Sequence, residues 1–189
     1  MKITLRYPGP DDVEPLFDAV RESIPELHPW APCCPLTYGP GDAARWVGEQ
    51  PAAREAGTAY EFLVLDDGGR ILGCCGINQI NRGFRLGNLG YWIRTSATRR
   101  GCATEAARRA AAWAFAHTEL HRLELLVAVG NLASQAVALK AGASLEGRLR
   151  CRFLVHGRFQ DAFVYSILRP SPLAPDPRGA APPPPGTDA

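Results

Sequence analysis

The sequence predicts an α/β fold with a mixed central sheet of about seven strands flanked by about four helices. Apolar side chains recur at helical spacing, i, i+3, i+4 and i+7, over residues 13–20. Apolar runs at 61–65 and 71–77 flank a glycine-containing turn at 66–69, which is a hairpin pattern. Segments of these two kinds alternate along the chain, as is typical of layered α/β folds.

The expected elements follow in the order strand, helices, three strands, helix, strand, helix, two strands. Asp11 and Asp12 suit the beginning of the first helix, because carboxylates are favoured at the positive end of a helix dipole. A short helical stretch is expected around residues 43–49. The later segments are a strand at 89–93, an alanine-rich helix at 102–117, a strand at 123–128, a helix at 132–140 and two final strands joined near 156–157.

The composition indicates one folded domain with an appended tail. The chain has 189 residues and a formal net charge of +2, and its basic residues are spread out, unlike those of a nucleic-acid-binding protein. Residues 170–189 are rich in proline, so we expect a disordered tail after a folded domain over residues 1–169. The N-terminus lacks an apolar signal-peptide core, and no stretch approaches the roughly 20 apolar residues of a membrane helix. We expect a cytoplasmic protein with no membrane partner.

The six cysteines do not have the spacing of a metal or redox site. Four of them form the adjacent pairs Cys33–Cys34 and Cys74–Cys75, and the sequence has no C-x-x-C pattern. We therefore expect no metal ion, and we interpret the thiols as small apolar side chains in a reducing compartment.

Residues 94–105 have the composition of an anion-binding loop. A strand runs into a loop that contains Arg99, Arg100 and Gly101, and the loop opens a helix. The first amide groups of a helix have no partners within it and lie at the positive end of its dipole. Gly101 permits a close main-chain approach, and the small Ala103 leaves the helix end open. The pattern predicts a pyrophosphate site, with an ordinary strand–helix connection as the alternative.

A second pattern lies at the beginning of the helix predicted at 132–140. Its weight as a functional signal comes from the loop at 94–105 that precedes it. Asn131 is a good N-cap residue and Ser134 follows in the first turn. Residues 101–106 resemble the second half of the acyl-CoA signature of the GNAT superfamily, Gln/Arg-x-x-Gly-x-Gly/Ala. The branch of that superfamily that acetylates the N-termini of ribosomal proteins is similar to this chain at residues 90–93, 120–124, 131–134, 140–143, 145–147, 156–158, 161 and 165.

The resemblance covers nearly the whole folded part and implies a GNAT-like fold, acetyl-CoA as co-substrate and a primary amine as acceptor. It implies that the main chain of Trp92 and Ile93 pairs with the pantetheine arm, and that Asn131 bonds the same arm. It implies that Ser134 protonates or stabilises the leaving thiolate. The pyrophosphate would be held by Arg99, Arg100, Gly101, Ala103 and Thr104.

Three positions depart from the family pattern: the one at Thr98 weakens one phosphate contact but spares the main-chain cradle, and the one at Phe153 leaves the general base open. Thr98 stands where the signature has Gln or Arg, Asn88 replaces an acidic residue before Gly-Tyr-Trp, and Phe153 replaces a glutamate that some relatives carry. Glu61 acting through water is a candidate base. Keeping an amine neutral at pH 7 costs about 1 kcal/mol for an α-amine but about 4.6 kcal/mol for lysine. Because the sequence shows no obvious strong base, the N-terminal α-amine of a protein or peptide is favoured as the acceptor.

Other functions stay open. The acceptor can be a small-molecule amine such as a polyamine, an amino acid or an antibiotic, although a polyamine site would need an acidic groove that the sequence does not indicate. A non-catalytic acyl-CoA-binding module and an adaptor acting through the proline-rich tail are further alternatives. Both a monomer and a homodimer are compatible with the sequence.

Overall fold

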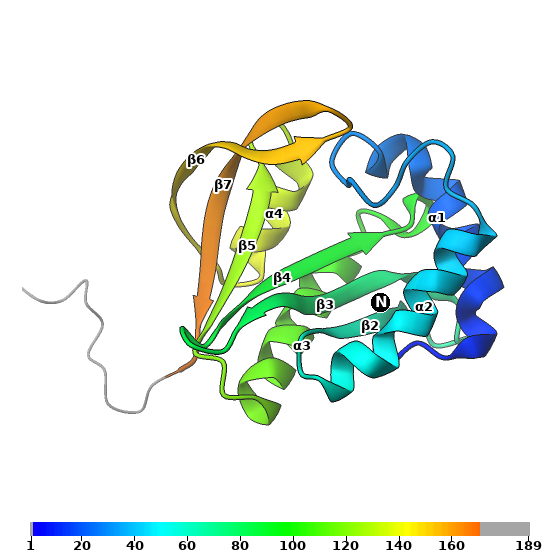
Figure 1. Ribbon diagram of the computed structural model, residues 1–189, viewed down its shortest axis with the longest axis horizontal. Coiled ribbons are helices and arrows are strands. Elements are labelled where there is room, and N and C mark those ends of the chain that lie inside the picture. Colours follow the sequence, from blue (N-terminus) through cyan, green and yellow to red (C-terminus); the bar gives the residue numbers. More distant parts are fainter. Residues whose placement is uncertain (1, 171–189) are drawn as a thin grey trace, which may run out of the picture.

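The alternating apolar segments form one seven-stranded sheet with helices on both faces, in a computed structural model that describes residues 2–170 (Figure 1). The strands are β1 (Thr4–Arg6), β2 (Tyr60–Leu65), β3 (Ile71–Asn81), β4 (Leu86–Ile93), β5 (Arg122–Ala128), β6 (Ser144–Val155) and β7 (Arg158–Leu168). The helices are α1 (Val13–Leu27), α2 (Pro40–Glu55), α3 (Cys102–His117) and α4 (Leu132–Lys140), with short 3-10 turns η1 (Pro10–Asp12) and η2 (Thr95–Ala97). The predicted fold class is confirmed.

The sheet is divided by a divergence between β4 and β5. Its strand order is β1-β2-β3-β4-β5-β7-β6, and β4 with β5 is its parallel pair. These two strands pair only from Leu86 to Asn88 of β4 and from Arg122 to Glu124 of β5, and they separate beyond that point (Figure 1). By contrast, β5 pairs with β7 along its whole length. The main chains of β4 and β5 therefore move apart toward their far ends, and we call the region between these two backbones the gap.

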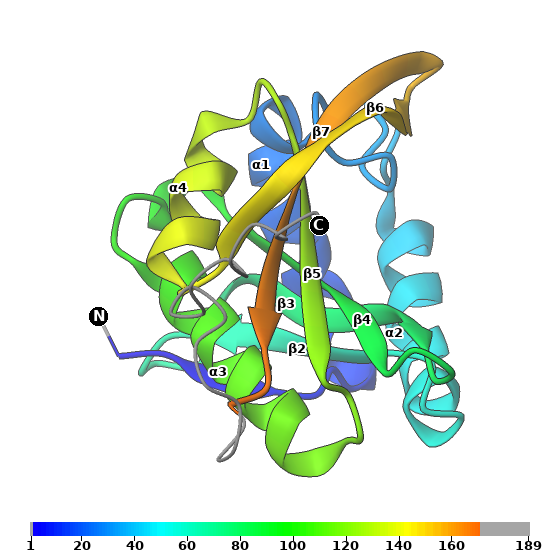
Figure 2. The same ribbon diagram turned by 90° about the vertical axis from the view of Figure 1, so that its left-hand side faces the viewer.

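Each face of the sheet has its own apolar core. On one face α3 packs closely, because its inward positions are the fully buried alanines Ala106, Ala107, Ala110 and Ala114. On the other face α1 and α2 pack on β2 and β3 through Leu16, Ala19, Val20, Ala43 and Val47. Figure 2 shows α3 and α4 on one side of the sheet and α2 on the other.

Several predicted elements have the observed bounds, whereas β3, β4 and α2 are longer than predicted. The helices at 102–117 and 132–140 are confirmed, as is the turn joining the last two strands near 156–157. The helical stretch predicted around 43–49 extends over the whole of α2, from Pro40 to Glu55. It begins earlier because the Asp42 carboxylate accepts a hydrogen bond from the Gly39 amide at 2.9 Å, which stabilises the first turn after a proline at N1.

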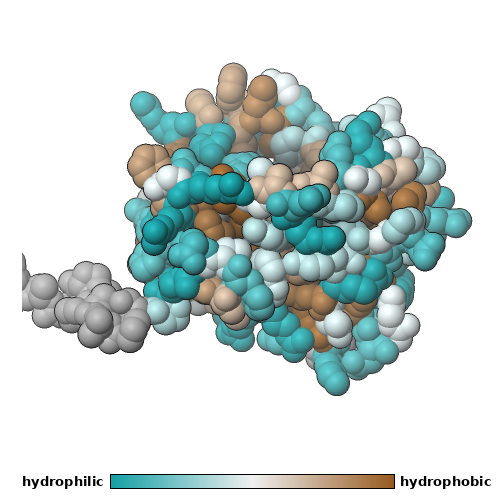
Figure 3. Space-filling view, turned by 60° about the horizontal axis from the view of Figure 1, so that its bottom comes forward, coloured by the Kyte–Doolittle hydropathy of each residue, from teal (hydrophilic) through white to brown (hydrophobic). Residues whose placement is uncertain are grey.

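The last described strand ends near the domain boundary that the sequence predicts. Strand β7 ends at Leu168, and the Arg169 amide still donates to the His121 carbonyl at 2.9 Å. Apart from Pro170, the proline-rich tail at 170–189 lies outside the described residues. On the face shown in Figure 3, hydrophilic side chains cover most of the surface and hydrophobic ones gather in small groups. None of the described helices is long and apolar enough to cross a membrane.

Candidate active site

The loop between β4 and α3 has the geometry of an anion cradle. Arg99 and Gly101 both have left-handed main-chain conformations, with φ of 61° and 80°. The Glu105 amide is the first in α3 to bond backward, to the Gly101 carbonyl at 3.0 Å. The amides of residues 102–104 thus have no main-chain acceptor among the described residues, and a Cβ placed on Gly101 would meet open space. These free donors at a helix N-terminus fit a pyrophosphate.

The predicted cradle side chains surround this loop. Arg99 and Arg100 are exposed, and neither belongs to an ion pair between described residues. Ala103 and Thr104 are half-buried in the first turn of α3. The structure therefore brings together all five residues that the sequence assigned to phosphate binding, and their charge suits a polyanion.

The end of β4 presents unpaired main-chain groups to the gap. The Arg94 amide donates to the Leu72 carbonyl at 2.7 Å, which fixes the alternation of the antiparallel β3–β4 ladder. By this alternation the main-chain groups of Trp92 point to Cys74 of β3, and those of Ile93 and Tyr91 point toward β5. Because β5 has already diverged, Ile93 and Tyr91 have no strand partner on that side within residues 2–170. The prediction of main-chain pairing with the pantetheine therefore shifts from Trp92 to Tyr91.

Ser134 lies across the gap from Tyr91. The Tyr91 hydroxyl donates to the Ser134 carbonyl at 3.0 Å and lies 3.1 Å from the Ser134 hydroxyl. Burial raises the pKa of Tyr91 to about 12, and the hydrogen bond to Ser134 partly opposes this. A neutral hydroxyl pair is thus held beside the gap at neutral pH. Sequence reasoning found Ser134 but missed Tyr91 as its partner, because the two residues are 43 positions apart.

Asn131 caps α4. Its side-chain oxygen accepts a hydrogen bond from the Ser134 amide at 3.0 Å, so the cap fixes the first turn in which Ser134 lies. This oxygen is already used, and the side-chain NH₂ group is the part of Asn131 that can still bond a ligand. The role that the family resemblance gave to Asn131 stays a prediction.

Glu61 belongs to a hydrogen-bonded row that crosses three strands. The Asn78 side chain on β3 donates to the Glu61 carboxylate at 2.9 Å, and the Asn88 side chain on β4 donates to Asn78 at 2.9 Å. A Cβ on Gly76, between them, would lie 2.1 Å from the Glu61 carboxylate. Glycine at position 76 thus lets the carboxylate lie over β3 toward β4. Burial raises the pKa of Glu61, and the Asn78 hydrogen bond opposes this shift.

Glu61 and Tyr91 lie on opposite faces of the sheet. Side chains alternate along a strand, and Leu63 of β2 belongs to the core under α1 and α2, so Glu61 points to that face. Tyr91 packs instead against the core under α3 and α4. A buried carboxylate and a hydroxyl pair therefore lie on the two sides of the sheet near the gap.

The connection between α1 and α2 covers the face on which Glu61 lies. The rings of His28 and His156 stack with centroids 3.8 Å apart, and a His156 nitrogen lies 3.0 Å from the His28 carbonyl. Trp30 lies over Gly130, at the open end of β5, where an added Cβ would be 3.2 Å from the indole. The hydrogen bond with Cys34 lowers the pKa of Cys33, and the charge of Glu61 opposes this shift. Residues 28–39 thus contact the hairpin tip and the end of β5, and Cys34 packs in the core on the face of the sheet to which Glu61 points.

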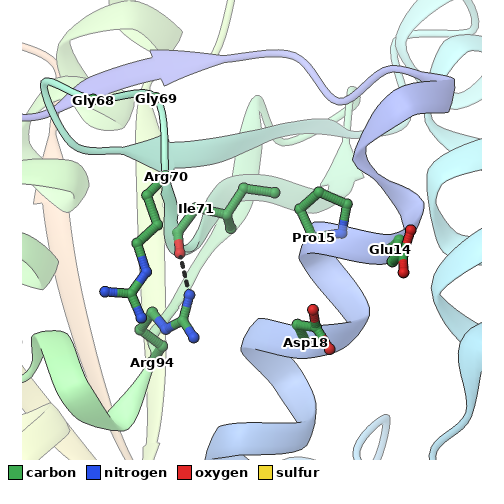
Figure 4. A pocket seen from close by; sticks show the side chains of 8 residues that line it. All are labelled: Glu14, Pro15, Asp18, Gly68, Gly69, Arg70, Ile71 and Arg94. Carbon is green, nitrogen blue, oxygen red and sulfur yellow. Dashed lines mark hydrogen bonds between the residues drawn. The ribbon is translucent and has the colours of Figure 1, made fainter.

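A surface cavity of about 550 Å³ lies between α1 and the end of β4 (Figure 4). Within it the Arg94 guanidinium points to the Ile71 carbonyl, at 3.1 Å (Figure 4). Arg94 also donates to Glu22 of α1 at 2.9 Å, and Glu22 accepts from the Ser96 amide at 2.8 Å. The Arg94 hydrogen bond lowers the pKa of Glu22 to about 2. We call this Glu22–Arg94–Ser96 connection the α1 brace; it anchors the chain just before the cradle.

Comparison with known proteins agrees with this geometry. Residues 2–144 match the acetyltransferase (GNAT) domain family. YdaF of Bacillus subtilis strain 168, named as a candidate ribosomal N-acetyltransferase, is 29% identical over 174 residues, which cover 88% of this chain and 91% of YdaF.

Two solved structures are similar in fold. The microcin C7 self-immunity acetyltransferase MccE, solved with acetyl-CoA and AMP, has a TM-score of 0.83 at 21% identity and covers 88% of this chain and 92% of its own. Spermidine N-acetyltransferase from Vibrio cholerae, solved with CoA and spermine, has a TM-score of 0.74 at 21% identity, over 88% and 95%. With its cradle, its gap and its family match, the chain belongs to the GNAT family and is an acetyl-CoA-dependent N-acetyltransferase.

Proposed function

We propose that the chain transfers the acetyl group of acetyl-CoA to the N-terminal α-amine of a protein or peptide, by direct attack in a ternary complex. The observation that carries this proposal is the placement of Glu61 and the Tyr91–Ser134 pair on opposite sides of the sheet near the β4–β5 gap. One side offers a proton acceptor for the amine, and the other offers a hydroxyl for the leaving thiolate. The name of YdaF supports the same class of acceptor.

The cofactor-binding role rests on the cradle and the β4 edge. Arg99, Arg100 and the amides from Gly101 through Ala103 to Thr104 hold the pyrophosphate, where free donors and positive charge meet. The main chain of Ile93 and Tyr91, with the Asn131 NH₂ group, holds the pantetheine arm. Acetyl-CoA supplies an activated thioester carbonyl, and the Ile93 amide polarises its oxygen.

The two proton transfers take place on opposite faces of the sheet. Glu61, whose pKa burial raises, accepts the amine proton through a water molecule. An α-amine is about 10% neutral at pH 7, so this base needs to be only weak. Ser134, held by the Asn131 cap and contacted by Tyr91, protonates or stabilises the departing thiolate.

The likeness to spermidine N-acetyltransferase makes a polyamine the second candidate acceptor. The positive charge of the β6–β7 hairpin disfavours a polyamine acceptor. Arg150, Arg152 and Arg158 are exposed there and belong to no ion pair between described residues, and they would repel a polycation.

A panel of acceptors tests the proposal. The purified chain is incubated with acetyl-CoA and a free-α-amine peptide, an N-blocked peptide containing lysine, or spermidine, and products are read by mass spectrometry. We expect acetylation at the α-amine, with kcat/KM rising with pH through the acceptor's own pKa and then levelling. Turnover of the blocked lysine peptide or of spermidine, with the free α-amine untouched, would overturn it.

A further inference from the structure

The β6–β7 hairpin is a sheet edge that carries unneutralised positive charge. Its acidic side chains are already paired: Asp161 accepts from Arg148 at 2.9 Å, and Glu146 accepts from Arg122 at 2.8 Å. The three arginines on its outer half, Arg150, Arg152 and Arg158, are exposed and form no ion pair with any described residue. We call residues 148–160 the arginine edge.

The arginine edge also offers main-chain and apolar contacts. Strand β6 is the last strand of the sheet, and its pairing with β7 is irregular between Leu149 and Phe153. Leu154 is 55% exposed and Phe159 is 69% exposed, between and beside the arginines. An extended peptide at such an edge can combine main-chain bonds, apolar contacts and carboxylate–arginine pairs.

The position of the edge connects it with the proposed acceptor site. Its tip contacts the α1–α2 connection through His156 on His28 and through Gln160, which donates to the Pro29 carbonyl at 3.2 Å. Cys34 of the same connection packs in the core on the face of the sheet to which Glu61 points. Figure 1 shows the hairpin tip next to this connection. A polypeptide whose N-terminus enters near Glu61 therefore has the arginine edge as an adjacent surface.

We propose that the arginine edge docks an acidic, extended segment of the acceptor polypeptide, downstream of its reactive N-terminus. This inference rests on the proposed α-amine function. Guanidinium groups bind carboxylates with strong, often bidentate hydrogen bonds. Arg158 pairs with Val155, and Val155 follows Arg152 by three residues along β6. The charges of Arg152 and Arg158 are therefore separated by roughly 10 Å along the strand. Carboxylates about three residues apart in an extended segment match this spacing.

Peptides that share their first three residues test the docking. Three of them continue with an acidic, a neutral or a basic segment of ten residues, and a fourth ends as a tripeptide amide. We expect kcat/KM for the acidic peptide to exceed that for the neutral one about tenfold at low salt, and to fall as salt is raised. The triple change Arg150→Glu, Arg152→Glu and Arg158→Glu is expected to abolish or reverse this preference.

Two controls make the result interpretable. Tripeptide turnover and the KM for acetyl-CoA should be unchanged in the triple variant, which shows that it is folded. Arg152→Glu is compared with Arg85→Glu, an exposed arginine at the β3–β4 turn, and only the former should reduce the preference. Equal rates for acidic, neutral and basic peptides would overturn the docking and leave the α-amine function standing. No turnover of any of the four peptides would overturn the α-amine function itself.

Discussion

At the residue scale, the proposed function assigns the departure of the thiolate to the Tyr91–Ser134 pair. Ser134→Ala is expected to lower kcat by about 10²–10⁴, with a smaller change in the KM for acetyl-CoA, because general-acid help acts in the transition state. Tyr91→Phe should have an effect in the same direction. Tyr165→Phe, another buried tyrosine, is the matched control and should leave kcat unchanged. Steady-state kinetics, with chemistry shown to limit the rate, checks the prediction.

Glu61 gives a prediction about pH. Its pKa is raised by burial, so activity should fall on the acid side at a pH above that of an ordinary glutamate, as the base becomes protonated. Glu61→Gln should remove this acid limb and lower kcat about 100-fold. A carboxyl whose folded pKa is raised destabilises the fold above that pKa, so Glu61→Gln should not lower the thermal midpoint at pH 8. A full-rate Glu61→Gln enzyme would show that the base lies elsewhere.

Sequence reasoning selected the residues whose signal is local. Gly101 and the two arginines before it stand out because a glycine and two positive charges occur together where a loop opens a helix. Tyr91 and Asn78 could not be found in the same way, since their roles arise only from partners on other strands or on α4. Phe153 indicated that a glutamate proposed as the base of some relatives is replaced, but the row that supports Glu61 required the β2–β3–β4 register.

At the element scale, the β4–α3 loop should bind acetyl-CoA through its main chain. Gly101→Asp puts a negative charge into the cradle, and Gly101→Asn puts a neutral side chain of similar shape at the same left-handed position. Both variants share the backbone strain, so the charge is the difference between them. We expect Gly101→Asp to weaken the Kd for acetyl-CoA by about tenfold or more relative to Gly101→Asn. Calorimetry showing equal affinities would refute the cradle assignment.

The α1 brace should contribute to stability in a pH-dependent way. The pKa of Glu22 is lowered to about 2, so its stabilising effect is present above its unfolded pKa and is lost as pH falls toward 2. Glu22→Gln should therefore lower the free energy of unfolding at pH 7, by about 2 kcal/mol, and by much less near pH 3. Asp18→Asn, which breaks an exposed pair on the same helix, is the control and should cost under about 1 kcal/mol. Urea unfolding at both pH values measures the difference.

At the scale of the whole molecule, residues beyond Arg169 should be dispensable. Arg169 bonds the Leu120 carbonyl at 2.9 Å through its side chain and the His121 carbonyl through its amide. A chain ending at Arg169 is expected to keep its kcat and thermal midpoint, and a chain ending at Leu168 to lose several degrees. Loss of acetyl transfer on truncation after Arg169 would favour the adaptor function for the tail.

The global arrangement was only partly predictable. The two final strands were predicted as a pair joined near residues 156–157, but the placement of β7 between β5 and β6 depends on pairs such as Leu123 with Ile167, far apart in the sequence. The bounds of α3 were predictable because its buried face is a regular series of alanines. The bounds of α2 were not, because Pro51 lies inside the helix and tertiary packing overrides local preference.

The divergence of β4 from β5 has a consequence for folding as well as for chemistry. The two halves of the sheet are joined at only three registered positions, and the amides of Tyr91 and Ile93 face a space where a strand would otherwise lie. In the proposed binding mode, the pantetheine arm takes the place of a neighbouring strand along this part of β4. The free energy of unfolding is then expected to rise by RT ln(1 + [L]/Kd), where [L] is the acetyl-CoA concentration. Hydrogen exchange at the Tyr91 and Ile93 amides should slow as acetyl-CoA is added.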